Sequence, residues 1–327
     1  MASDADLAVT IGVTAFNCEK TLGAAVASAL AQDHHDIHIL IVDDCSSDRT
    51  NKIARRLVET NPNVTLISNS KNMGVSGSRN IIIENTKTPF IAFFDDDDVS
   101  RPDRISKQLA AIVACEENTH QSLILCHTAR LVTYSNAQTR YHPSLAQEAG
   151  TNGVSGAIVS EAILCGTSDY RLRGACPTCS QMARTNAYQA LGGFDQNLRR
   201  SEDTELSIRA AENDARFIGI RDPLVYQKMT LRADKNIEIE TKNWLYVLSK
   251  HRSVIERKMS FSFAINWLYL RHNWQAKFYK NFTLILLKLV LTSPFQTLRK
   301  LCLAIPNMGI NAAMSKFHHK SEPRKQP

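Results

Sequence analysis

The sequence predicts an α/β protein with a mostly parallel central sheet flanked by helices. Short apolar runs rich in β-branched residues recur through the first 115 residues, and segments with helical spacing of apolar residues lie between them. Strands that alternate with helices over this length are typical of a parallel sheet with helices on both faces. Apolar residues make up 43% of the 327 residues, which is enough for a packed core.

The first half of the chain contains the most regular pattern. Apolar runs predict strands at 7–15, 37–42, 64–68 and 90–94. The intervening segments predict helices at 19–32, 47–59 and 76–85. Ser100 is expected to cap a further helix that has Pro102 in its first turn.

The second half is less regular. Strands are predicted at 123–134, 179–183, 217–220 and 224–226, and helices at 185–191 and 201–212. Beyond residue 228 the chain becomes helical and basic. We therefore expect one domain over residues 1–227, with halves at about 7–115 and 116–227, and a helical extension over 228–327.

Charge is distributed unevenly between these two parts. The net formal charge is +7, but residues 228–327 hold 18 basic and 5 acidic residues, whereas the first 227 residues hold 21 basic and 27 acidic ones. A basic tail on a mildly acidic body indicates an anionic partner for the tail. The aromatic residues of the tail lie among aliphatic ones at helical spacing, which is typical of a core or an interface and argues against a nucleic-acid partner.

Cysteine usage and targeting signals favour a cytoplasmic chain. The eight cysteines are scattered, which suits a reduced compartment better than a disulfide scaffold. Cys176 and Cys179 form one pair with zinc-like or redox-like spacing, but no second Cys or His pair accompanies them. The acidic N-terminus shows no secretory signal, and no apolar run reaches the roughly 18–20 residues that span a bilayer.

Three polar clusters follow the predicted strands of the first half. They are 14–17 after the first strand, Asp43 and Asp44 after the second, and Asp95–Asp98 after the fourth. Ligands of parallel α/β sheets bind at the carboxyl ends of the strands, so these clusters are expected to converge on one site.

The run of four aspartates is the strongest chemical signal. Four adjacent carboxylates repel one another, and a divalent cation bound through oxygen would compensate them, although a solvated acidic turn is the plain alternative. Arg79 is predicted in the first turn of its helix, where a cation is unusual and an anionic ligand or a base would explain it. Glu202 and Asp203 lie in the first turn of another helix, a position that favours acidic residues even without a function.

Taken in order, these segments resemble the family 2 glycosyltransferases, which have the GT-A fold. The matching segments are VTIGVTAFN at 9–17, ALAQD at 29–33, IVDDCSSDRT at 41–50, NMGVSGSRN at 72–80, FIAFFDDDD at 90–98 followed by Pro102, GGFD at 192–195 and SEDTEL at 201–206. The likeness covers roughly residues 8–227. Cys45 departs from the family pattern, in which glycine is commoner at that position.

The resemblance implies a nucleotide site in the half at about 7–115. Asp44 and Arg79 would hold the nucleotide base, and the pocket would be lined by Thr14, Ala15 and Asn17. Asp95 or Asp96 would contact the ribose side of the nucleotide. A uridine diphosphate sugar is the donor that the resemblance favours.

The resemblance also implies the chemical groups. Asp97 of the DXD motif would bind Mn²⁺ or Mg²⁺, which stabilises the charge of a leaving diphosphate. Asp203 would be the general base that takes a proton from the acceptor hydroxyl, with Glu202 among the substrate-binding residues. The choice of Asp203 over Glu202 as the base depends on the family pattern.

The predicted function is therefore that of an inverting glycosyltransferase, of the hexosyl- or N-acetylhexosaminyl-transferase class, in bacterial-type surface polysaccharide or lipopolysaccharide synthesis. The acceptor would be a glycan or a lipid-linked glycan, and the basic helices would contact the inner face of the cell membrane peripherally. An acceptor-binding region, or a helical subdomain that only packs on the catalytic domain, are the alternatives for these helices. Two alternatives stay open: a catalytically silent nucleotide-sugar binding or scaffold protein, and a nucleotidyltransferase. No G-x-G-x-x-G follows the first strand, which argues against a nicotinamide-dependent dehydrogenase.

Overall fold

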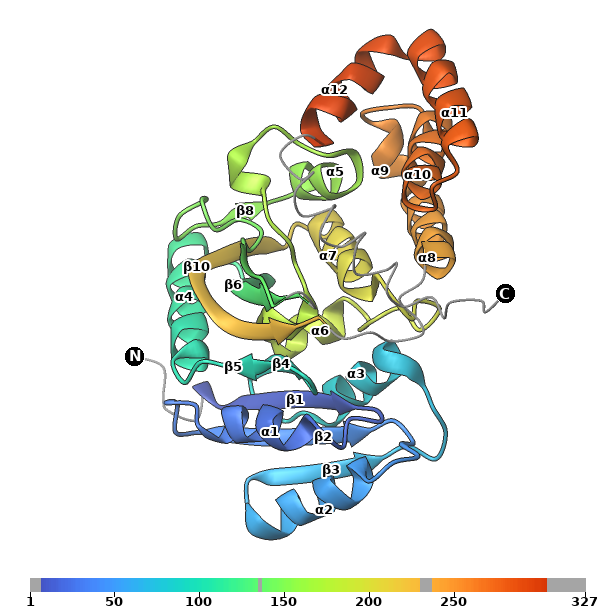
Figure 1. The fold of residues 1–327 in the computed structure, drawn as a ribbon. Helices are drawn as coiled ribbons and strands as arrows, with labels where there is room; N and C mark the ends of the chain where they lie inside the picture. Colours follow the sequence, from blue (N-terminus) through green and yellow to red (C-terminus); the bar gives the residue numbers. More distant parts are fainter. Residues whose placement is uncertain (1–6, 135–136, 230–236, 305–327) are drawn as a thin grey trace, which may run out of the picture. The chain divides into compact units, whose positions relative to one another are not determined.

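A ten-stranded mixed sheet forms the centre of the protein in the computed structural model, which describes residues 7–134, 137–229 and 237–304 (Figure 1). The strand order is β3-β2-β1-β4-β9-β6-β10-β5, with β7 beside β6 and β8 beside β10. The predicted fold class, a mostly parallel sheet flanked by helices and followed by C-terminal helices, is confirmed.

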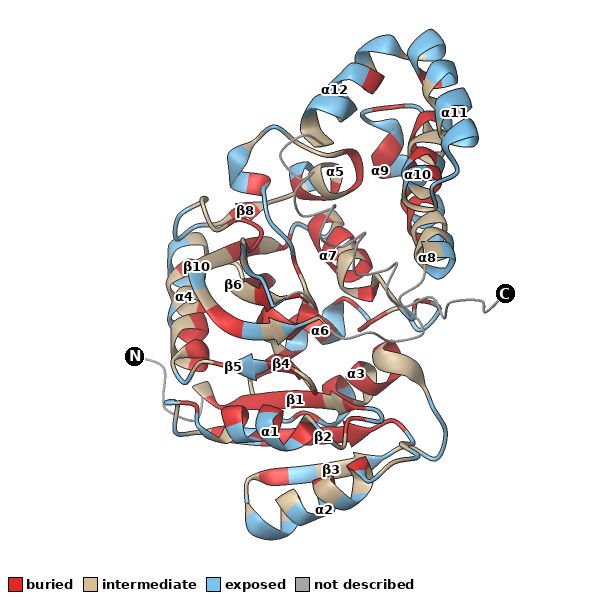
Figure 2. Cartoon of the chain, in the orientation of Figure 1, coloured by how far each residue is buried: buried red, intermediate tan, exposed pale blue. Residues whose placement is uncertain are grey.

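The first half of the chain forms its strands and helices close to where the sequence predicts them. It consists of β1 (Val9–Ala15), α1 (Leu22–Leu30), β2 (Ile37–Asp43), α2 (Thr50–Thr60), β3 (Val64–Ser68), α3 (Gly74–Asn85) and β4 (Phe90–Asp95). All the pairings among β1, β2, β3 and β4 are parallel. The apolar residues of β1 and β2 are almost all buried, because helices cover a parallel sheet on both faces (Figure 2).

The second half is where the sheet becomes mixed. β9 (Gln181–Arg184) lies between β4 and β6 (Ile124–Thr133) and runs antiparallel to both. The two predicted closing strands are one long strand, β10 (Arg216–Lys228), which pairs with β6 and carries a bulge at Pro223. Proline has no N–H to donate, so the hydrogen-bond register between β10 and β6 shifts at Pro223. The apolar pattern is interrupted at the same place, and it therefore predicted two strands.

The remaining elements of this half are mostly short. They are β5 (Val99–Ser100), α4 (Arg104–Thr119), β7 (Thr139–His142), β8 (Val154–Ser155), the 3₁₀ turns at Tyr170–Leu172 and Thr178–Ser180, α6 (Thr185–Ala190) and α7 (Glu202–Glu212). The strands β5, β7 and β8 were not predicted, because two to four residues carry too little periodicity to be recognised.

The prediction that Ser100 caps a helix is wrong. Ser100 belongs to β5, which pairs antiparallel with β10, and α4 begins only at Arg104. The Ser100 hydroxyl instead accepts a hydrogen bond from Nη1 of Arg104 at 2.9 Å. Because the Arg104 guanidinium is fully buried, it needs acceptors, and the Phe93 carbonyl and Gln108 supply two more.

The chain divides into two compact units. The first comprises the described parts of 1–133, 139–156 and 170–228 and contains the sheet. The second comprises those of 134–138, 157–169 and 229–327 and is helical. Its helices are α5 (Ala157–Cys165), α8 (Ile237–Lys250), α9 (Arg252–Glu256), α10 (Phe261–Gln275), α11 (Tyr279–Thr292) and α12 (Pro294–Ala304). Over the described residues, no helix combines the length and apolarity needed to cross a membrane.

Candidate active site

The carboxyl ends of β1, β2 and β4 meet at one edge of the sheet. The parallel register places Ala15 opposite Asp43 and Thr14 opposite Asp95. Ala15 is buried and Thr14 is half-buried at this edge. The structure therefore brings together the three polar clusters that follow these strands in the sequence.

Asp44 is buried and fixes the loop after β2 to the start of α3. Its carboxylate accepts hydrogen bonds from the backbone N–H groups of Met73 at 2.7 Å and Gly74 at 2.8 Å, and from the Asn69 amide at 2.9 Å. The first N–H groups of a helix have no partner within it, and a carboxylate there is also favoured by the helix dipole. Asp44 is thus held rigidly at the N-terminus of α3.

Asn17 ties the loop after β1 to the loop after β2. Its Oδ1 atom accepts from the backbone N–H of Ser47 at 2.8 Å, and its own N–H donates to the Ser46 hydroxyl at 3.0 Å. The Asp44 N–H donates to the Ala15 carbonyl at 2.8 Å. Asn17 itself is exposed, with a φ of 48°. The hydrogen bonds between the two loops hold them together as one rim beside Asp44.

Arg79 is buried in the second turn of α3 and not in the first turn that was expected, because α3 already begins at Gly74. Its Nη1 atom donates to Oε1 of Glu202 at 2.6 Å, and its Nη2 atom donates to Oδ1 of Asp95 at 3.1 Å. Burial alone would lower the pKa of the guanidinium, but the charges of Glu202 and Asp95 outweigh it and raise that pKa. Ion pairs, and not an empty anion site, explain this cation.

Two aromatic rings complete the surroundings of the Arg79 guanidinium. Its central carbon lies 5.3 Å from the ring centroid of Phe194 and 6.0 Å from that of Phe93. The two rings contact each other edge to face at 5.5 Å. A guanidinium over aromatic faces is attracted by the ring quadrupoles, so these contacts hold the side chain in place.

The start of α7 brings the second pair of acids to the same place. Glu202, the first residue of α7, is buried, and burial raises the pKa of its carboxyl while Arg79 opposes that rise. Asp203 is half-buried, and its Oδ1 atom accepts from the Thr204 N–H at 2.6 Å. Arg79 thus connects α7 with the end of β4, although residues 95 and 202 are far apart in sequence.

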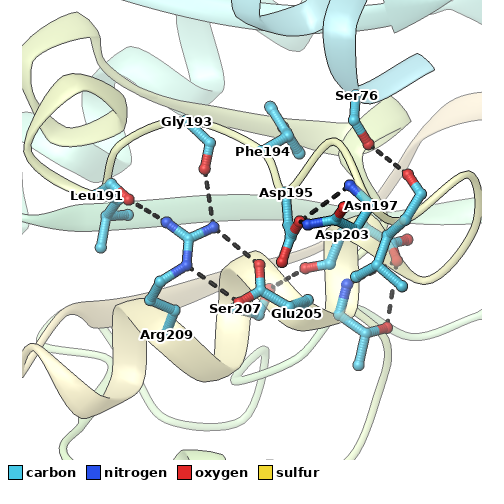
Figure 3. A network of polar contacts seen from close by, with 12 residues as sticks. Ser76, Leu191, Gly193, Phe194, Asp195, Asn197, Asp203, Glu205, Ser207 and Arg209 are labelled. Carbon is cyan, nitrogen blue, oxygen red and sulfur yellow. Dashed lines mark hydrogen bonds and ion pairs between the residues drawn. The ribbon is translucent and has the colours of Figure 1, made fainter. Parts of the chain in front are cut away.

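The glycine-rich loop before α7 is held by Arg209 (Figure 3). The Arg209 guanidinium donates to the carbonyls of Leu191 and Gly193, the latter at 2.8 Å, and forms a two-pronged ion pair with the buried Glu205. Figure 3 shows this guanidinium between the loop and the helix, with Asp203 on the same helix. The i, i+4 spacing of Glu205 and Arg209 is the sequence signal for this pair, but it does not reveal the loop contacts.

The same loop is fixed from the other side by Asn80. The Asn80 amide accepts from the Phe194 N–H at 2.7 Å and donates to the Phe194 carbonyl at 2.9 Å. Gly193 adopts a φ of 69°, and a Cβ there would lie 2.4 Å from Asn80 Oδ1. The loop therefore needs glycine at 193, and the Asn80 contacts hold Phe194 against Arg79. Sequence reasoning missed Asn80, Phe194, Glu205 and Arg209.

The four aspartates at the end of β4 have different surroundings. Asp95 is half-buried and paired with Arg79, whereas Asp96 is buried and accepts from the Phe16 N–H at 3.2 Å. Asp97 is half-buried. Asp98 is buried, and burial together with the charges of Asp95 and Asp97 raises the pKa of its carboxyl well above the usual range.

Oxygen and sulfur atoms near Asp98 form a candidate cation site. Carboxylate oxygens of Asp95 and Asp98 and the sulfur of Cys179 lie within 4.8 Å of one another, and Oδ1 of Asp98 has no hydrogen-bond partner. The two carboxylates suit Mg²⁺ or Mn²⁺. Burial raises the pKa of the Cys179 thiol, so the sulfur stays protonated and is a poor ligand for a hard cation. Asp97, the ligand that the sequence predicted, is not part of this group.

Part of the sequence matches a known family. The family described as "Glycosyl transferase family 2" matches residues 10–149. The putative glycosyltransferase EpsE of Bacillus subtilis is 27% identical over 229 residues, which are 68% of this chain and 73% of EpsE.

Two further relatives are matched over shorter stretches. The succinoglycan biosynthesis protein ExoO of Rhizobium meliloti is 38% identical over 101 residues, or 31% of this chain and 28% of ExoO. The Escherichia coli protein WfaP, a UDP-Glc:alpha-D-GlcNAc-diphosphoundecaprenol beta-1,3-glucosyltransferase, is 37% identical over 101 residues, or 31% of this chain and 39% of WfaP. Both matches thus span less than half of the relative.

Solved structures share the fold at low sequence identity. The S. aureus TarS fragment 1–349 in complex with UDP-GlcNAc has a TM-score of 0.56 at 17% identity, over 81% of this chain and 72% of that one. The mannosyltransferase PcManGT of Pyrobaculum calidifontis, in complex with GDP-Man and Mn²⁺, has a TM-score of 0.56 at 14% identity, over 96% of this chain and 85% of that one. Residues 10–149 of this chain therefore match glycosyltransferase family 2, and the fold around them is of the GT-A type.

Proposed function

We propose that this protein is an inverting glycosyltransferase that moves a sugar from a uridine diphosphate sugar to a hydroxyl of a glycan or glycolipid acceptor. One observation carries the proposal: the Arg79 guanidinium bridges Asp95 at the end of β4 and Glu202 at the start of α7. A single buried side chain thus joins the nucleotide edge of the sheet to the helix that carries the candidate base, Asp203. In this proposal, donor and acceptor meet where these two elements meet.

On the donor side, the rim of the sheet suits a nucleotide. The buried carboxylate of Asp44 is held beside the N-terminus of α3, and Thr14, Ala15 and Asn17 line the same rim. A rigid carboxylate can accept a hydrogen bond from an N–H group of the base. Asp95 or Asp96 takes the ribose side in this assignment.

The diphosphate needs a counter-charge when it leaves. Asp97 is the ligand that the family resemblance implies, and the carboxylates of Asp95 and Asp98, which lie within 4.8 Å of each other, are a second candidate pair of ligands. A bound Mn²⁺ or Mg²⁺ would supply Lewis-acid stabilisation of the leaving diphosphate. The remaining catalytic tasks belong to the side chains of this chain.

On the acceptor side, Asp203 takes the proton of the attacking hydroxyl. The acceptor oxygen bonds to the anomeric carbon on the face opposite the diphosphate, and the bond from that carbon to the diphosphate oxygen breaks with its electron pair. A single displacement of this kind inverts the anomeric centre. Asp203 suits the task better than Glu202, because Glu202 is buried and committed to Arg79, whereas Asp203 is half-buried.

The biological setting follows from the relatives and from charge. WfaP is named for a diphosphoundecaprenol-linked acceptor and ExoO for succinoglycan biosynthesis. We infer a hexosyl- or N-acetylhexosaminyl-transferase that extends a lipid-linked glycan in bacterial-type surface polysaccharide synthesis. Its place would be the cytoplasmic face of the cell membrane, which the basic C-terminal part would contact.

Donor release tests the proposal. The full chain is incubated with a panel of nucleotide sugars and Mn²⁺ or Mg²⁺, with and without a lipid-linked glycan extract, and free nucleoside diphosphate is measured. Asp203→Asn is expected to lower turnover by about 10²–10⁴-fold, the usual contribution of a positioned acid or base. Glu59→Gln, an equally conservative change on the exposed face of α2, serves as the matched control and should leave turnover unchanged.

The outcomes separate the alternatives. Donor binding without release from any donor would identify a silent binding protein. Release of inorganic pyrophosphate from a nucleoside triphosphate and a sugar phosphate would identify a nucleotidyltransferase. A product with retained anomeric configuration, measured by NMR, would contradict the single displacement.

A further inference from the structure

The last two helices of the helical unit expose an unusual amount of apolar surface. The residues Leu284, Leu287, Leu291, Phe295, Leu298 and Leu301 are between 40% and 87% exposed, and together they define what we term the α11–α12 face. Figure 2 shows both helices largely in the colour of exposed residues. Contiguous exposed apolar surface of this kind marks an interaction site.

The spacing of these residues places those of each helix on one side of that helix. Leu284, Leu287 and Leu291 are three and four residues apart, which places them on one side of α11. Phe295 and Leu298 are likewise three apart on α12. By contrast, Leu289 and Thr297 are buried, and the Thr297 hydroxyl donates to the Leu289 carbonyl at 3.0 Å, so other sides of the helices already pack together.

The turn between α10 and α11 adds exposed aromatic residues. Trp274, Phe278 and Tyr279 are each more than half exposed, and the rings of Trp274 and Tyr279 contact each other at a centroid distance of 6.0 Å. Tryptophan and tyrosine are enriched at membrane–water interfaces, because each has an apolar body and a polar edge. This turn therefore extends the apolar surface with residues suited to the headgroup level.

The stretch of chain that carries this surface is basic, although two of its cations, Lys258 and Arg271, form ion pairs with Glu161 and Glu240. Residues 257–304 contain eight lysines and arginines and no aspartate or glutamate. Lys277 is exposed just before α11, Lys280 is exposed in the first turn of α11, and Arg299 is exposed on α12. Basic side chains next to exposed apolar ones match an anionic, partly apolar partner.

We propose that the α11–α12 face and the aromatic turn dock in the plane of an anionic phospholipid bilayer. With 14 and 11 residues, α11 and α12 are shorter than the roughly 20 that span a bilayer, so the helices lie in the interface. A second copy of the chain is a poorer occupant, because a two-fold interface would bring the same basic residues together. This proposal names the surface that makes the membrane contact suggested under the proposed function. Only the reason for that contact, access to a lipid-linked acceptor, rests on the proposed function.

The test is sedimentation of the full chain with vesicles. Vesicles of phosphatidylcholine alone are compared with vesicles that also contain phosphatidylglycerol. Leu291→Glu combined with Phe295→Glu should remove binding to both kinds, and these side chains are 82% and 87% exposed, so folding should be unaffected. Lys277→Ser combined with Lys280→Ser should weaken binding only to the anionic vesicles, by roughly five-fold per lysine.

Tyr170→Glu is the matched control. Tyr170 is a 60% exposed aromatic residue in the other unit, and its replacement should leave vesicle binding unchanged. Donor release without vesicles, measured in parallel, separates failure of this proposal from failure of the proposed catalysis. Wild type that ignores anionic vesicles would overturn the proposal. So would a dimer, detected by analytical ultracentrifugation, that falls apart in the Leu291→Glu, Phe295→Glu variant.

Discussion

Replacing Arg79 by methionine is expected to destabilise the fold strongly. The change removes the shared partner of Glu202 and Asp95, whose side chains are 11% and 28% exposed, while nearly preserving the volume of the aliphatic stem. Breaking a buried ion pair by removing one partner typically costs roughly 3–5 kcal/mol, because the other charge stays buried and uncompensated. Asp95 can turn to water more easily than Glu202, so most of the loss comes from Glu202.

Protonation of the Glu202 carboxyl limits this loss of stability. Burial already raises the pKa of Glu202 in the presence of Arg79, and without Arg79 that pKa rises further. The orphaned carboxyl can then be neutralised at mildly acidic pH. We therefore expect a loss of about 3 kcal/mol at pH 8, the lower end of the range, and a smaller loss at pH 5.

Urea unfolding followed by circular dichroism measures this effect. Arg49→Met, which breaks the exposed pair with Glu19, is the matched control and should leave the unfolding midpoint unchanged. The double variant Arg79→Met, Glu202→Gln should be more stable than Arg79→Met alone, because it no longer buries an orphan charge. Equal stability of Arg79→Met and wild type would refute the reasoning, as would strict additivity in the cycle.

A conservative substitution of Arg79 distinguishes its two possible roles in the reaction. The family resemblance gives Arg79 a contact with the nucleotide base, whereas the geometry gives it two carboxylate partners inside the protein. If Arg79 mainly positions the start of α7, Arg79→Lys should lower kcat and leave the KM of the donor nearly unchanged. A raised donor KM at unchanged kcat would support the base contact instead.

Three further predictions concern other parts of the sheet unit. Gly193→Ala should cost about 1–3 kcal/mol in unfolding free energy, because its Cβ would meet the Asn80 amide at 2.4 Å with φ at 69°. Gly192→Ala, with a similar φ but no atom within 4 Å, should cost less; an equal cost for both would contradict the clash. Burial lowers the pKa of His127 to about 3, so the unfolded chain binds the proton first, and stability present above pH 6.5 is lost as the pH falls toward 3. Between pH 7.5 and 5 the His127 contribution to unfolding free energy should fall by roughly 2 kcal/mol, and His127→Gln should remove that part of the dependence. Chelation by EDTA should abolish donor release and added Mn²⁺ should restore it, and Cys179→Ser should need the same Mn²⁺ concentration for half-maximal release; a clearly higher concentration would make the thiol a ligand.

The sequence by itself determined the edge of the sheet at which the candidate site lies. β1 to β4 are nearly continuous apolar runs with helices between them, and this local pattern leaves little choice except a parallel sheet. Once the strands are parallel, their carboxyl ends meet at one edge, so the convergence of Asp44 and Asp95 follows from chain order alone. The family resemblance added the roles of these residues, and those roles stay predictions.

Only the tertiary structure decided how the two sides of the site are joined. Nothing local in the sequence pairs Arg79 with Glu202, 123 residues away, or seats Asn80 against the loop at Phe194. A strand was predicted at 179–183, but its place between β4 and β6 and its antiparallel direction were not, because a run of four residues reveals neither its direction nor its neighbours. Periodicity reports which face of an element is buried, but the partner of a buried charge is set by packing between distant segments.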